Sequence, residues 1–238
     1  MIRPPANPAG TGNQHEDRLM ENPYFEAWQA LPGTTDRWGT LHPENSIIDH
    51  LRARRILAPR YAWAIPSEEA IKILLSHGPL VEMGAGTGYW AWCVRQMGGD
   101  IIAYDEKPYD NHWCGRTGQR DRDAVDVSLR MTSHSFDDDD DNEPRWTDVL
   151  IGKPKSLTKH CDRTLFLCWP PYRSRMASDC LRWHQSQRII YVGEGSGGAT
   201  GTDAFHARLI KDFEEIQTLA IPQWWGMHDW LWVYERKR

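Results

Sequence analysis

The sequence predicts an α/β fold in which helices cover both faces of a mostly parallel, seven-stranded sheet. Short apolar runs alternate with amphipathic segments: a strand is predicted at 80–83, a helix at 89–97 and a second strand at 101–104. This alternation is typical of parallel strands joined by helices. Two aromatic-rich runs near the end, 216–225 and 229–237, have no helical segment between them. They predict an antiparallel pair at the edge of the sheet.

The chain of 238 residues is long enough for one domain with a buried core. Residues 1–58 predict a tail followed by a helical cap, and residues 59–238 predict the main domain. Two cap helices are expected, one at 15–30 with an interruption at Pro23 and one at 43–57. The second of them is amphipathic, with four apolar side chains roughly on one face: Ile47, Ile48, Leu51 and Ile56.

The main domain begins with a well-marked helix. Ser67 precedes two glutamates and an apolar run, which is typical of a helix start, and Gly78 is a suitable stop. The later elements follow the same alternation. They are a weak strand at 146–151, a helix at 156–160, a strand at 164–169, a helix at 174–184, a strand at 188–195 and a helix at 203–213.

Acidic side chains are concentrated in one segment of the chain. Residues 110–145 contain ten acidic and five basic side chains, which accounts for the whole net charge of −5. The run of aspartates at 137–141 repels itself and predicts a flexible, solvated insertion. It lacks the alternating ligands and turn glycine of a calcium loop. No basic stripe is present that could follow a phosphate backbone, so we expect no nucleic-acid partner.

Other features bear on location, metals and assembly. No apolar run approaches the ~20 residues that span a bilayer, and the first residues do not resemble a secretory signal. Five cysteines without CxxC spacing favour a reducing, cytoplasmic compartment. A zinc site built from His112, Cys114, His160 and Cys161 would have irregular spacing, so we expect no metal. Many of the 13 tryptophans belong to the core or to a contact between two copies, and a homodimer is one outcome.

Four glycines surround the turn after the first predicted strand, in GPLVEMGAGTGYW, residues 78–90. Glycines let the backbone adopt conformations closed to other residues and let a ligand approach the main chain. Ligands of open parallel sheets bind beyond the carboxyl ends of the strands. A dinucleotide fingerprint, GxGxxG, read from Gly84 has Tyr89 at its sixth position, whereas a reading from Gly86 satisfies only the permissive GxGxxA form. An acid-x-Gly-x-Gly-x-Gly pattern instead begins at Glu82.

With this pattern, VEMGAGTGYW resembles the first motif of the class I S-adenosylmethionine-dependent methyltransferases. The resemblance implies a Rossmann-like three-layer sandwich whose C-terminal strand is antiparallel, and a loop that wraps the methionine and ribose parts of the cofactor. Asp105, at the end of the next strand, matches the carboxylate that accepts hydrogen bonds from the ribose hydroxyls in that family. The cofactor-binding residues that the resemblance implies are Glu82, Gly84, Ala85, Gly86, Gly88, Tyr89, Trp90, Asp105 and Glu106, with Tyr61 and Trp63 offering aromatic faces to the sulfonium.

A second motif lies in LFLCWPPYRSRMA, residues 165–177. It is similar to the proline turn of the amino-methyltransferases, in which a polar residue and a proline carbonyl accept hydrogen bonds from a planar amino group. Trp169 departs from that pattern because indole has no acceptor. Trp169, Pro170, Pro171 and Tyr172 are therefore predicted to face the methyl acceptor, with a rigid structural turn as the alternative.

A second glycine-rich stretch, 193–201, follows the next strand. Glu194 within it is the natural acid to contact a substrate amine, or else a carboxylate that only holds its loop. His206 and the pair His228-Asp229 are possible proton acceptors, and each has a purely structural alternative.

Together these resemblances imply a methyltransferase with S-adenosylmethionine as its cofactor and a small-molecule acceptor, with N-methylation favoured. A nucleic-acid amino-methyltransferase, a non-catalytic binder of the same cofactor and an NAD(P) enzyme remain alternatives.

Overall fold

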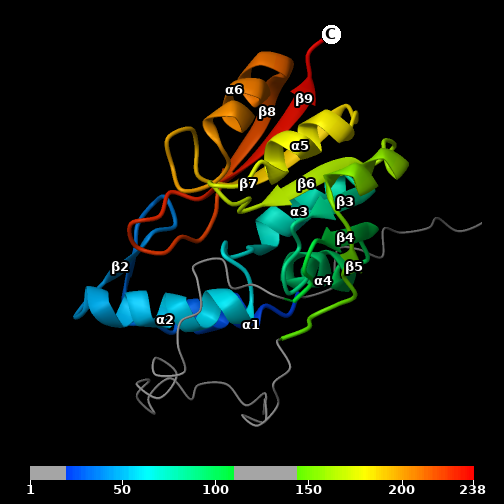
Figure 1. The fold of residues 1–238 in the computed structure, drawn as a ribbon. Helices are drawn as coiled ribbons and strands as arrows, with labels where there is room; N and C mark the ends of the chain where they lie inside the picture. The colour runs from blue at the N-terminus through cyan, green and yellow to red at the C-terminus, as the bar shows by residue number, and fades with distance from the viewer. Residues whose placement is uncertain (1–19, 110–143) are drawn as a thin grey trace, which may run out of the picture.

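A computed structural model describes residues 20–109 and 144–238 (Figure 1). Residues 1–19 and 110–143 lie outside the described residues, and with them His112, Cys114 and nearly all of the predicted acidic insertion.

One seven-stranded sheet forms the centre of the protein, with the order β5-β4-β3-β6-β7-β9-β8. Its strands are β3 (Leu80–Met83), β4 (Ile101–Asp105), β5 (Leu150–Ile151), β6 (Thr164–Cys168), β7 (Arg188–Gly193), β8 (Phe213–Ala220) and β9 (Trp230–Arg236). Every pair from β5 across to β7 is parallel, whereas β9 runs antiparallel to both of its neighbours, β7 and β8. The predicted α/β, Rossmann-like sheet with an antiparallel C-terminal strand is confirmed.

Side chains of the central strands alternate between two cores, one on each face of the sheet. Leu80, for example, packs with α3 (Glu68–Ser76) and α4 (Tyr89–Gln96), and its neighbour Val81 packs with α5 (Met176–Trp183) and α6 (Asp203–Asp212) on the other face. Successive residues of a strand point to opposite faces, so strands buried on both sides read as continuous apolar runs. The result is the predicted three-layer arrangement of helices, sheet and helices (Figure 1).

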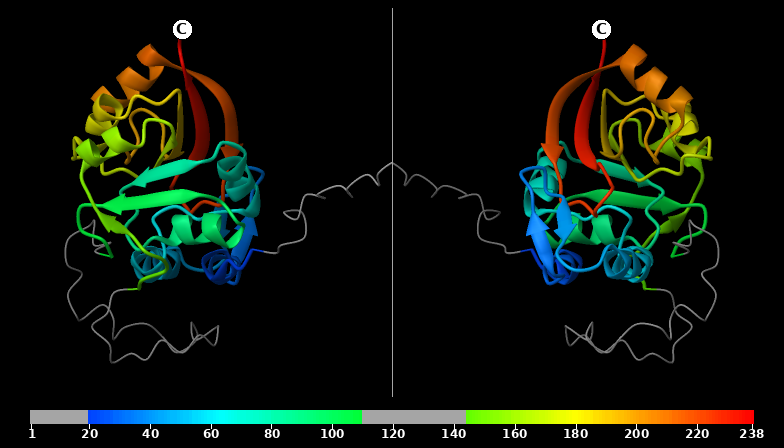
Figure 2. Two further views of the ribbon diagram at one scale, coloured as in Figure 1. Left: turned by 90° about the vertical axis from the view of Figure 1, so that its right-hand side faces the viewer. Right: turned by 90° about the vertical axis from the view of Figure 1, so that its left-hand side faces the viewer.

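The N-terminal part adds two helices and a small hairpin on the α3–α4 side of the sheet (Figure 2). Helix α1 (Pro23–Gln29) starts at Pro23, because proline is favoured in the first turn and Asn22 caps the helix by accepting from the N–H of Phe25. Pro23 therefore begins this helix instead of interrupting it. A two-stranded hairpin of β1 (Gly33–Thr35) and β2 (Leu41–Pro43) was not predicted.

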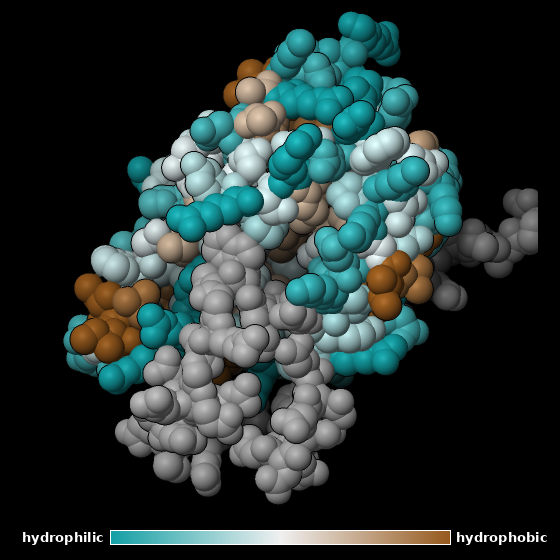
Figure 3. All heavy atoms as spheres, viewed as in Figure 1, coloured by the Kyte–Doolittle hydropathy of each residue, from teal (hydrophilic) through white to brown (hydrophobic). Residues whose placement is uncertain are grey.

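Helix α2 (Ile47–Arg60) differs most from expectation. Ser46 caps it, so the helix starts four residues after the predicted start at Pro43. Its apolar side chains Ile47, Ile48 and Leu51 are 45, 62 and 46% exposed. The residues that it buries are His50, Ala53 and Ala58. The two alanines let the helix lie close to the rest of the protein, and the ring of His50 lies 2.8 Å from the carbonyl of Pro32. The exposed end of α2 forms the brown patch at the left of Figure 3.

The C-terminal pair begins and ends earlier than predicted. β8 starts at Phe213, directly after α6, and stops at Ala220, so Trp224 and Trp225 lie in the connection to β9. The segment predicted as a helix at 156–160 is a 3-10 helix, η3 (Pro154–Lys159). Among the helices of the described part of the chain, none is both long enough and apolar enough to cross a bilayer.

Candidate functional site

The predicted site residues gather at the carboxyl ends of β3, β4, β6 and β7. From β3 the chain continues outward to β4, and from β6 it continues in the opposite direction to β7. β3 and β6 are neighbours, so the strand order reverses between them. Such a reversal leaves a crevice beyond the strand ends, where ligands of open α/β sheets bind.

The glycine loop, defined as residues 84–88, needs its glycines for conformation and for space. Gly84, Gly86 and Gly88 have φ angles of 85°, 53° and 81°, in the left-handed region that other residues avoid. A Cβ atom on Gly84 would lie 2.9 Å from Cε of Met176, and one on Gly88 would lie 2.9 Å from Cγ2 of Val149. Gly88 also caps the N-terminus of α4. The loop is therefore closed to side chains at these positions.

Asp105 contacts this loop directly. Its Oδ2 accepts from the backbone N–H of Gly86 at 3.0 Å, and its Oδ1 accepts from that of Lys107 at 2.7 Å. The carbonyl of Tyr104 accepts from the N–H groups of Gly84 and Ala85. The two halves of the predicted cofactor site are thus brought together. Glu106 instead reaches away to Lys153, 2.8 Å from its Nζ, and this pairing lowers the pKa of the Glu106 carboxyl.

Tyr109 and Trp146, which lie just before and just after residues 110–143, are both hydrogen-bonded to the glycine loop. The N–H of Tyr109 donates to the carbonyl of Gly86 at 2.9 Å, and that of Trp146 donates to the carbonyl of Thr87 at 3.1 Å. The hydroxyl of Thr87 donates to the carbonyl of Tyr61. These contacts hold the loop from its outer side.

Glu82 lies buried at the base of the loop, and its Oε2 has no hydrogen-bond partner in the described residues. Burial raises the pKa of its carboxyl to about 8; the charge of Asp105 adds to the shift and that of Arg95 opposes it. A buried carboxylate with a free oxygen can receive a cationic N–H group.

This raised pKa predicts a pH-dependent stability for the ligand-free protein. A carboxyl whose pKa is higher in the folded state stabilises fully below its unfolded pKa of 4.5, and the contribution is lost as pH rises toward about 8. The free energy of unfolding should therefore fall across this window, by at most about 1.4 kcal/mol per pH unit for this one group. We expect Glu82→Gln to flatten the profile in denaturant titrations at several pH values. Glu68→Gln, which alters an exposed ion pair to Lys72, is the control, and parallel profiles for the wild type and Glu82→Gln would contradict the assignment.

Three of the predicted cofactor aromatics belong to the core. Tyr61 is stacked between Tyr24 and Trp146, with centroid distances of 4.9 and 5.2 Å, so both of its faces are covered. The hydroxyl of Tyr89 donates to Asn22, and the indole N–H of Trp90 donates to the carbonyl of Ala64. Both side chains are buried. The ring of Tyr61 therefore packs between two other aromatic rings, whereas the sequence predicted that it faces a sulfonium.

The side chains of Tyr89 and Trp90 are likewise directed into the core, because they occupy the inward face of α4. Only their backbone can lie along the loop.

The proline turn also has a different set of contacts from the predicted one. The carbonyl of Pro170 accepts from the N–H of Gly201 at 2.8 Å, and that of Pro171 accepts from the N–H of Ser174 at 3.1 Å. These carbonyls hold the second glycine-rich stretch and the turn itself, which fits the structural alternative for the proline turn. Tyr172 is 43% exposed, and Trp169 is buried with a φ angle of 50°.

Glu194 likewise holds its surroundings together. Its Oε2 accepts from the N–H of Ala199 at 2.5 Å, and its Oε1 accepts from that of His228 at 3.0 Å. The structural alternative for Glu194 is thus the one that the geometry favours. The ring of His206 lies 2.8 Å from the carbonyl of Thr200.

Asp229 is a second buried carboxylate, besides Glu82, with an oxygen that has no partner in the described residues. It is 1% exposed; its Oδ1 accepts from the indole N–H of Trp169 at 2.7 Å, and its Oδ2 has no partner in the described residues. Burial raises the pKa of Asp229 to about 7, the indole bond lowers it, the charge of Glu194 raises it and that of Arg54 lowers it. In the sequence, Asp229 stands beside an aromatic run. This pattern indicates a buried polar group but does not identify its hydrogen-bond partner.

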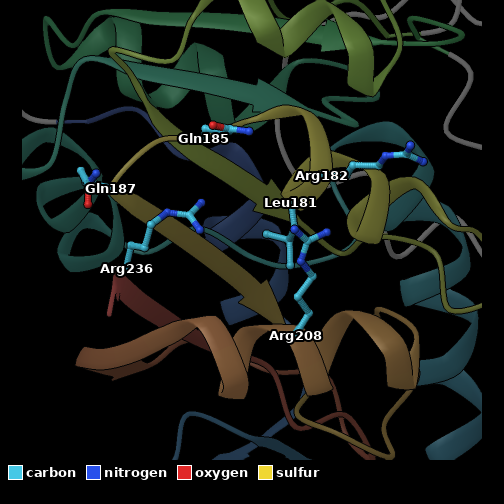
Figure 4. A pocket seen from close by; sticks show the side chains of 6 residues that line it. All are labelled: Leu181, Arg182, Gln185, Gln187, Arg208 and Arg236. Atoms are coloured by element: carbon cyan, nitrogen blue, oxygen red, sulfur yellow. The ribbon is translucent and has the colours of Figure 1, made fainter. Parts of the chain in front are cut away.

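One hollow lies apart from this edge of the sheet. A hollow of about 320 Å³ near the amino end of β7 is lined by Leu181, Arg182, Gln185, Gln187, Arg208 and Arg236 (Figure 4). Across residues 20–109 and 144–238, no three His, Cys, Asp or Glu side chains are grouped as metal ligands.

No family model matches this chain, and no curated protein sequence matches it. Among solved structures it is similar to magnesium protoporphyrin IX methyltransferase from Synechocystis PCC 6803 with bound S-adenosylmethionine, at 12% identity and a TM-score of 0.45 over 90% of this chain and 91% of that chain.

A TehB-like methyltransferase from Corynebacterium glutamicum shares 12% identity over 80% of this chain and 98% of its own, with a TM-score of 0.43. An rRNA methylase from Streptococcus thermophilus shares 10% identity over 71% and 95%, with a TM-score of 0.37. Because these TM-scores lie below 0.5, the fold class is assigned from the strand order and strand directions of this chain itself.

Proposed function

We propose that this protein is an S-adenosylmethionine-dependent methyltransferase that acts on a small-molecule acceptor, with a nitrogen atom as the favoured target. The observation that carries the proposal is the contact between Asp105 and the glycine loop, 3.0 Å from Oδ2 to the nitrogen of Gly86. Through this contact the carboxylate at the end of β4 lies beside the glycine loop, which follows the neighbouring strand β3. It lies on the predicted side of the sheet, next to the point where the strand order reverses.

The residues at this place fit the cofactor. Its methionine part carries an ammonium group, and the free oxygen of buried Glu82 is an acceptor without a partner. Its ribose carries two hydroxyls, and each carboxylate oxygen of Asp105 accepts one backbone N–H and keeps capacity for a further donor. The three glycines of the loop hold it in left-handed conformations that leave its backbone without side chains at these positions.

The contacts in the structure reduce the set of residues that we propose for the cofactor site. Glu82, Gly84, Ala85, Gly86, Gly88 and Asp105 are proposed to hold the cofactor through side chain or backbone. Tyr89 and Trp90 would contribute backbone only, and Glu106 remains a peripheral candidate held at the surface by Lys153. Trp63 and Trp169 are proposed to form the boundary toward the acceptor, since their rings stack at 5.7 Å.

When bound, S-adenosylmethionine supplies a methyl group activated by a positively charged sulfur. The part of this chain in the reaction is to bind, orient and exclude water. Ionised Glu82 would fix the ammonium end, and Asp105 would fix the ribose end. The aromatic boundary of half-buried Trp63 and buried Trp169 would keep water from the reacting atoms.

Calorimetric titration with S-adenosylhomocysteine tests this function. We expect one site per chain, with an affinity in the micromolar range that is typical for small-molecule cofactors. A parallel titration with NADH, followed by its fluorescence, should show no binding. Binding of NADH in place of S-adenosylhomocysteine would assign the site to a dehydrogenase, and binding of neither would remove the cofactor proposal. Salt-sensitive retention of the protein on RNA at low salt would move the acceptor from a small molecule to nucleic acid.

A further inference from the structure

The hollow at the amino end of β7 is lined by three arginines. Arg182 belongs to α5, Arg208 to α6 and Arg236 to the last position of β9. The other described residues that line it are Leu181, Gln185 and Gln187, so none of them carries a carboxylate. Guanidinium groups and primary amides both donate hydrogen bonds, and the guanidinium groups also carry positive charge. The hollow therefore offers donors for an anion from three separate elements and one connection.

The side chain of Arg236 is held in place by its inner part. Its Nε donates to the carbonyl of Ser186 at 3.3 Å, and its guanidinium carbon lies 4.6 Å from the ring centroid of buried Phe213. Within residues 20–109 and 144–238, no carboxylate forms an ion pair with it. The two Nη atoms can thus donate to a ligand from a side chain that is already ordered, which lowers the entropy lost on binding.

Arg208 is anchored in the same manner. Its Nε lies 3.2 Å from Oδ2 of Asp212, one turn later on α6. The guanidinium groups of Arg208 and Arg236 point into the hollow from different sides (Figure 4). Glu235, the neighbour of Arg236 on β9, is engaged by Arg188 at 3.3 Å. Both acids next to these arginines are therefore paired outside the lining of the hollow.

The connection from α5 to β7 supplies the two glutamines. His184 and Ser186 are buried and hold this connection, because the ring of His184 lies 2.9 Å from the carbonyl of Arg163 and the hydroxyl of Ser186 donates to the carbonyl of Arg188. The residues that alternate with them, Gln185 and Gln187, are exposed and line the hollow. Their amide N–H groups can supplement the arginine donors.

The size and place of the hollow separate it from the proposed cofactor site. Its volume of about 320 Å³ lies at the lower end of the range for small-molecule pockets, about 300–1,000 Å³. β7 runs from Arg188, at the hollow, to Gly193, at the edge where the predicted site residues gather. Six residues of a strand span about 16 Å, so the hollow and the cofactor edge lie at opposite ends of β7.

We propose that this hollow binds the phosphate groups of a small phosphorylated molecule. Arg208 and Arg236 bind phosphate oxygens through their Nη atoms, and Arg182 adds charge at the rim. A carboxylate presents two oxygens in one plane and is satisfied by a single guanidinium fork, whereas a phosphate presents oxygens in several directions to donors on different sides. The hollow is local and continues into no basic stripe of the sequence, which favours a small molecule over nucleic acid. This site does not depend on the proposed methyltransferase function.

Calorimetric titration with pyrophosphate tests the site, with malonate as a carboxylate probe of similar size. We expect the wild type to bind one pyrophosphate per chain, with an affinity of about 1 mM or tighter at low salt, and to bind malonate about tenfold more weakly. Binding should weaken as salt is added, because the interaction is between charges near the surface. Absence of pyrophosphate binding in the millimolar range, or equal affinity for malonate, would overturn the proposal.

Matched variants test the arginines. Arg208→Met and Arg236→Met should each weaken pyrophosphate about tenfold or more, since methionine keeps an apolar stem but loses the charged donors. Arg236→Lys keeps the charge and loses the fork, so a smaller loss is expected. Arg52→Met removes the same charge from an exposed ion pair on α2 and should have no effect. Wild-type affinity in both hollow variants, or an equal loss in Arg52→Met, would contradict the assignment.

A variant that adds a charge guards against effects on folding. Gln187→Glu changes an exposed side chain, so the protein should fold, and the new carboxylate should abolish pyrophosphate binding by occupying the arginines. Undiminished binding in this variant would refute the site.

The place and the source of the phosphate are tested separately. Saturation with S-adenosylhomocysteine should leave the affinity for pyrophosphate unchanged, and competition between the two would move pyrophosphate to the cofactor edge and overturn the proposal. A single-stranded RNA that binds far more tightly than pyrophosphate and is lost in Arg208→Met and Arg236→Met would assign the surface to nucleic acid instead. Failure of S-adenosylhomocysteine to bind removes only the proposed function, because the pyrophosphate titrations need no cofactor.

Discussion

Replacing Asp105 with alanine is expected to weaken binding of S-adenosylhomocysteine about 100-fold. Hydrogen bonds to a charged group contribute about 1.5–3 kcal/mol each, and two ribose hydroxyls would lose their acceptor. The variant would also lose the bond from the N–H of Gly86, which helps to hold the glycine loop in shape. Calorimetric titration of the purified variant measures the change.

The charge and the fold can be separated by two further variants. Asp105→Asn keeps the shape and one acceptor oxygen, so an intermediate loss of about tenfold is expected. Asp100 precedes the same strand at its opposite end, where it pairs with Arg163 at 2.8 Å through both of its oxygens. Asp100→Ala should leave cofactor affinity unchanged. Equal affinities for wild type and Asp105→Ala would disprove the ribose assignment.

Replacing Trp90 with alanine is expected to reduce the free energy of unfolding by about 3–5 kcal/mol. Trp90 is fully buried between α4 and the sheet, where its ring lies 5.5 Å from that of Phe166. The substitution would leave a cavity and would also leave the carbonyl of Ala64 without its donor. Denaturant-induced unfolding, followed by circular dichroism, measures the loss.

Trp90→Phe distinguishes the structural role of this residue from a role in cofactor binding. The variant keeps much of the buried area, so it should fold and bind S-adenosylhomocysteine as the wild type does. Trp38→Ala serves as the comparison for stability, because that side chain is 46% exposed and should cost far less. A marked loss of cofactor affinity in Trp90→Phe would restore the direct contact that the sequence suggested.

The sheet was predictable because its strands are short and apolar and its helices are amphipathic. Leu80–Met83 and Ile101–Asp105 pair in parallel with the glycine loop between them, as the alternation predicted. The antiparallel end followed from two aromatic runs without an intervening helix. Each of these features depends on a local pattern that repeats at the period of its element.

The cap was less predictable because its contacts are not local. The apolar residues of α2 suggested an inward face, but Ala53 and His50 face the protein and Ile48 faces solvent. Exposed apolar residues on one face of a helix have the same periodicity as core residues, so a helical pattern cannot separate them. The aromatic residue Tyr61 was similarly ambiguous, since its stacking partners lie 37 residues before and 85 residues after it.

The candidate site was predictable where a motif is contiguous and unpredictable where it is assembled from distant segments. The glycine loop and Asp105 were predicted from contiguous residues and their resemblance to a known motif, and the structure brings them into contact. The pairing of Trp169 with Asp229 spans 60 residues and has no sequence signal. Glu194 and the carbonyl of Pro170 accept hydrogen bonds from backbone N–H groups of distant segments, and no local pattern in the sequence indicates these partners.

Gln223 joins the N-terminal hairpin to the connection between β8 and β9. Its backbone exchanges hydrogen bonds with Gly39 and Leu41, and its side chain donates to the carbonyls of Trp38 and Asp229. A substitution on either side therefore alters the frame that holds the other. A change in one stretch is therefore expected to persist only with a compatible change in the other, so the two should vary together among descendants of this chain.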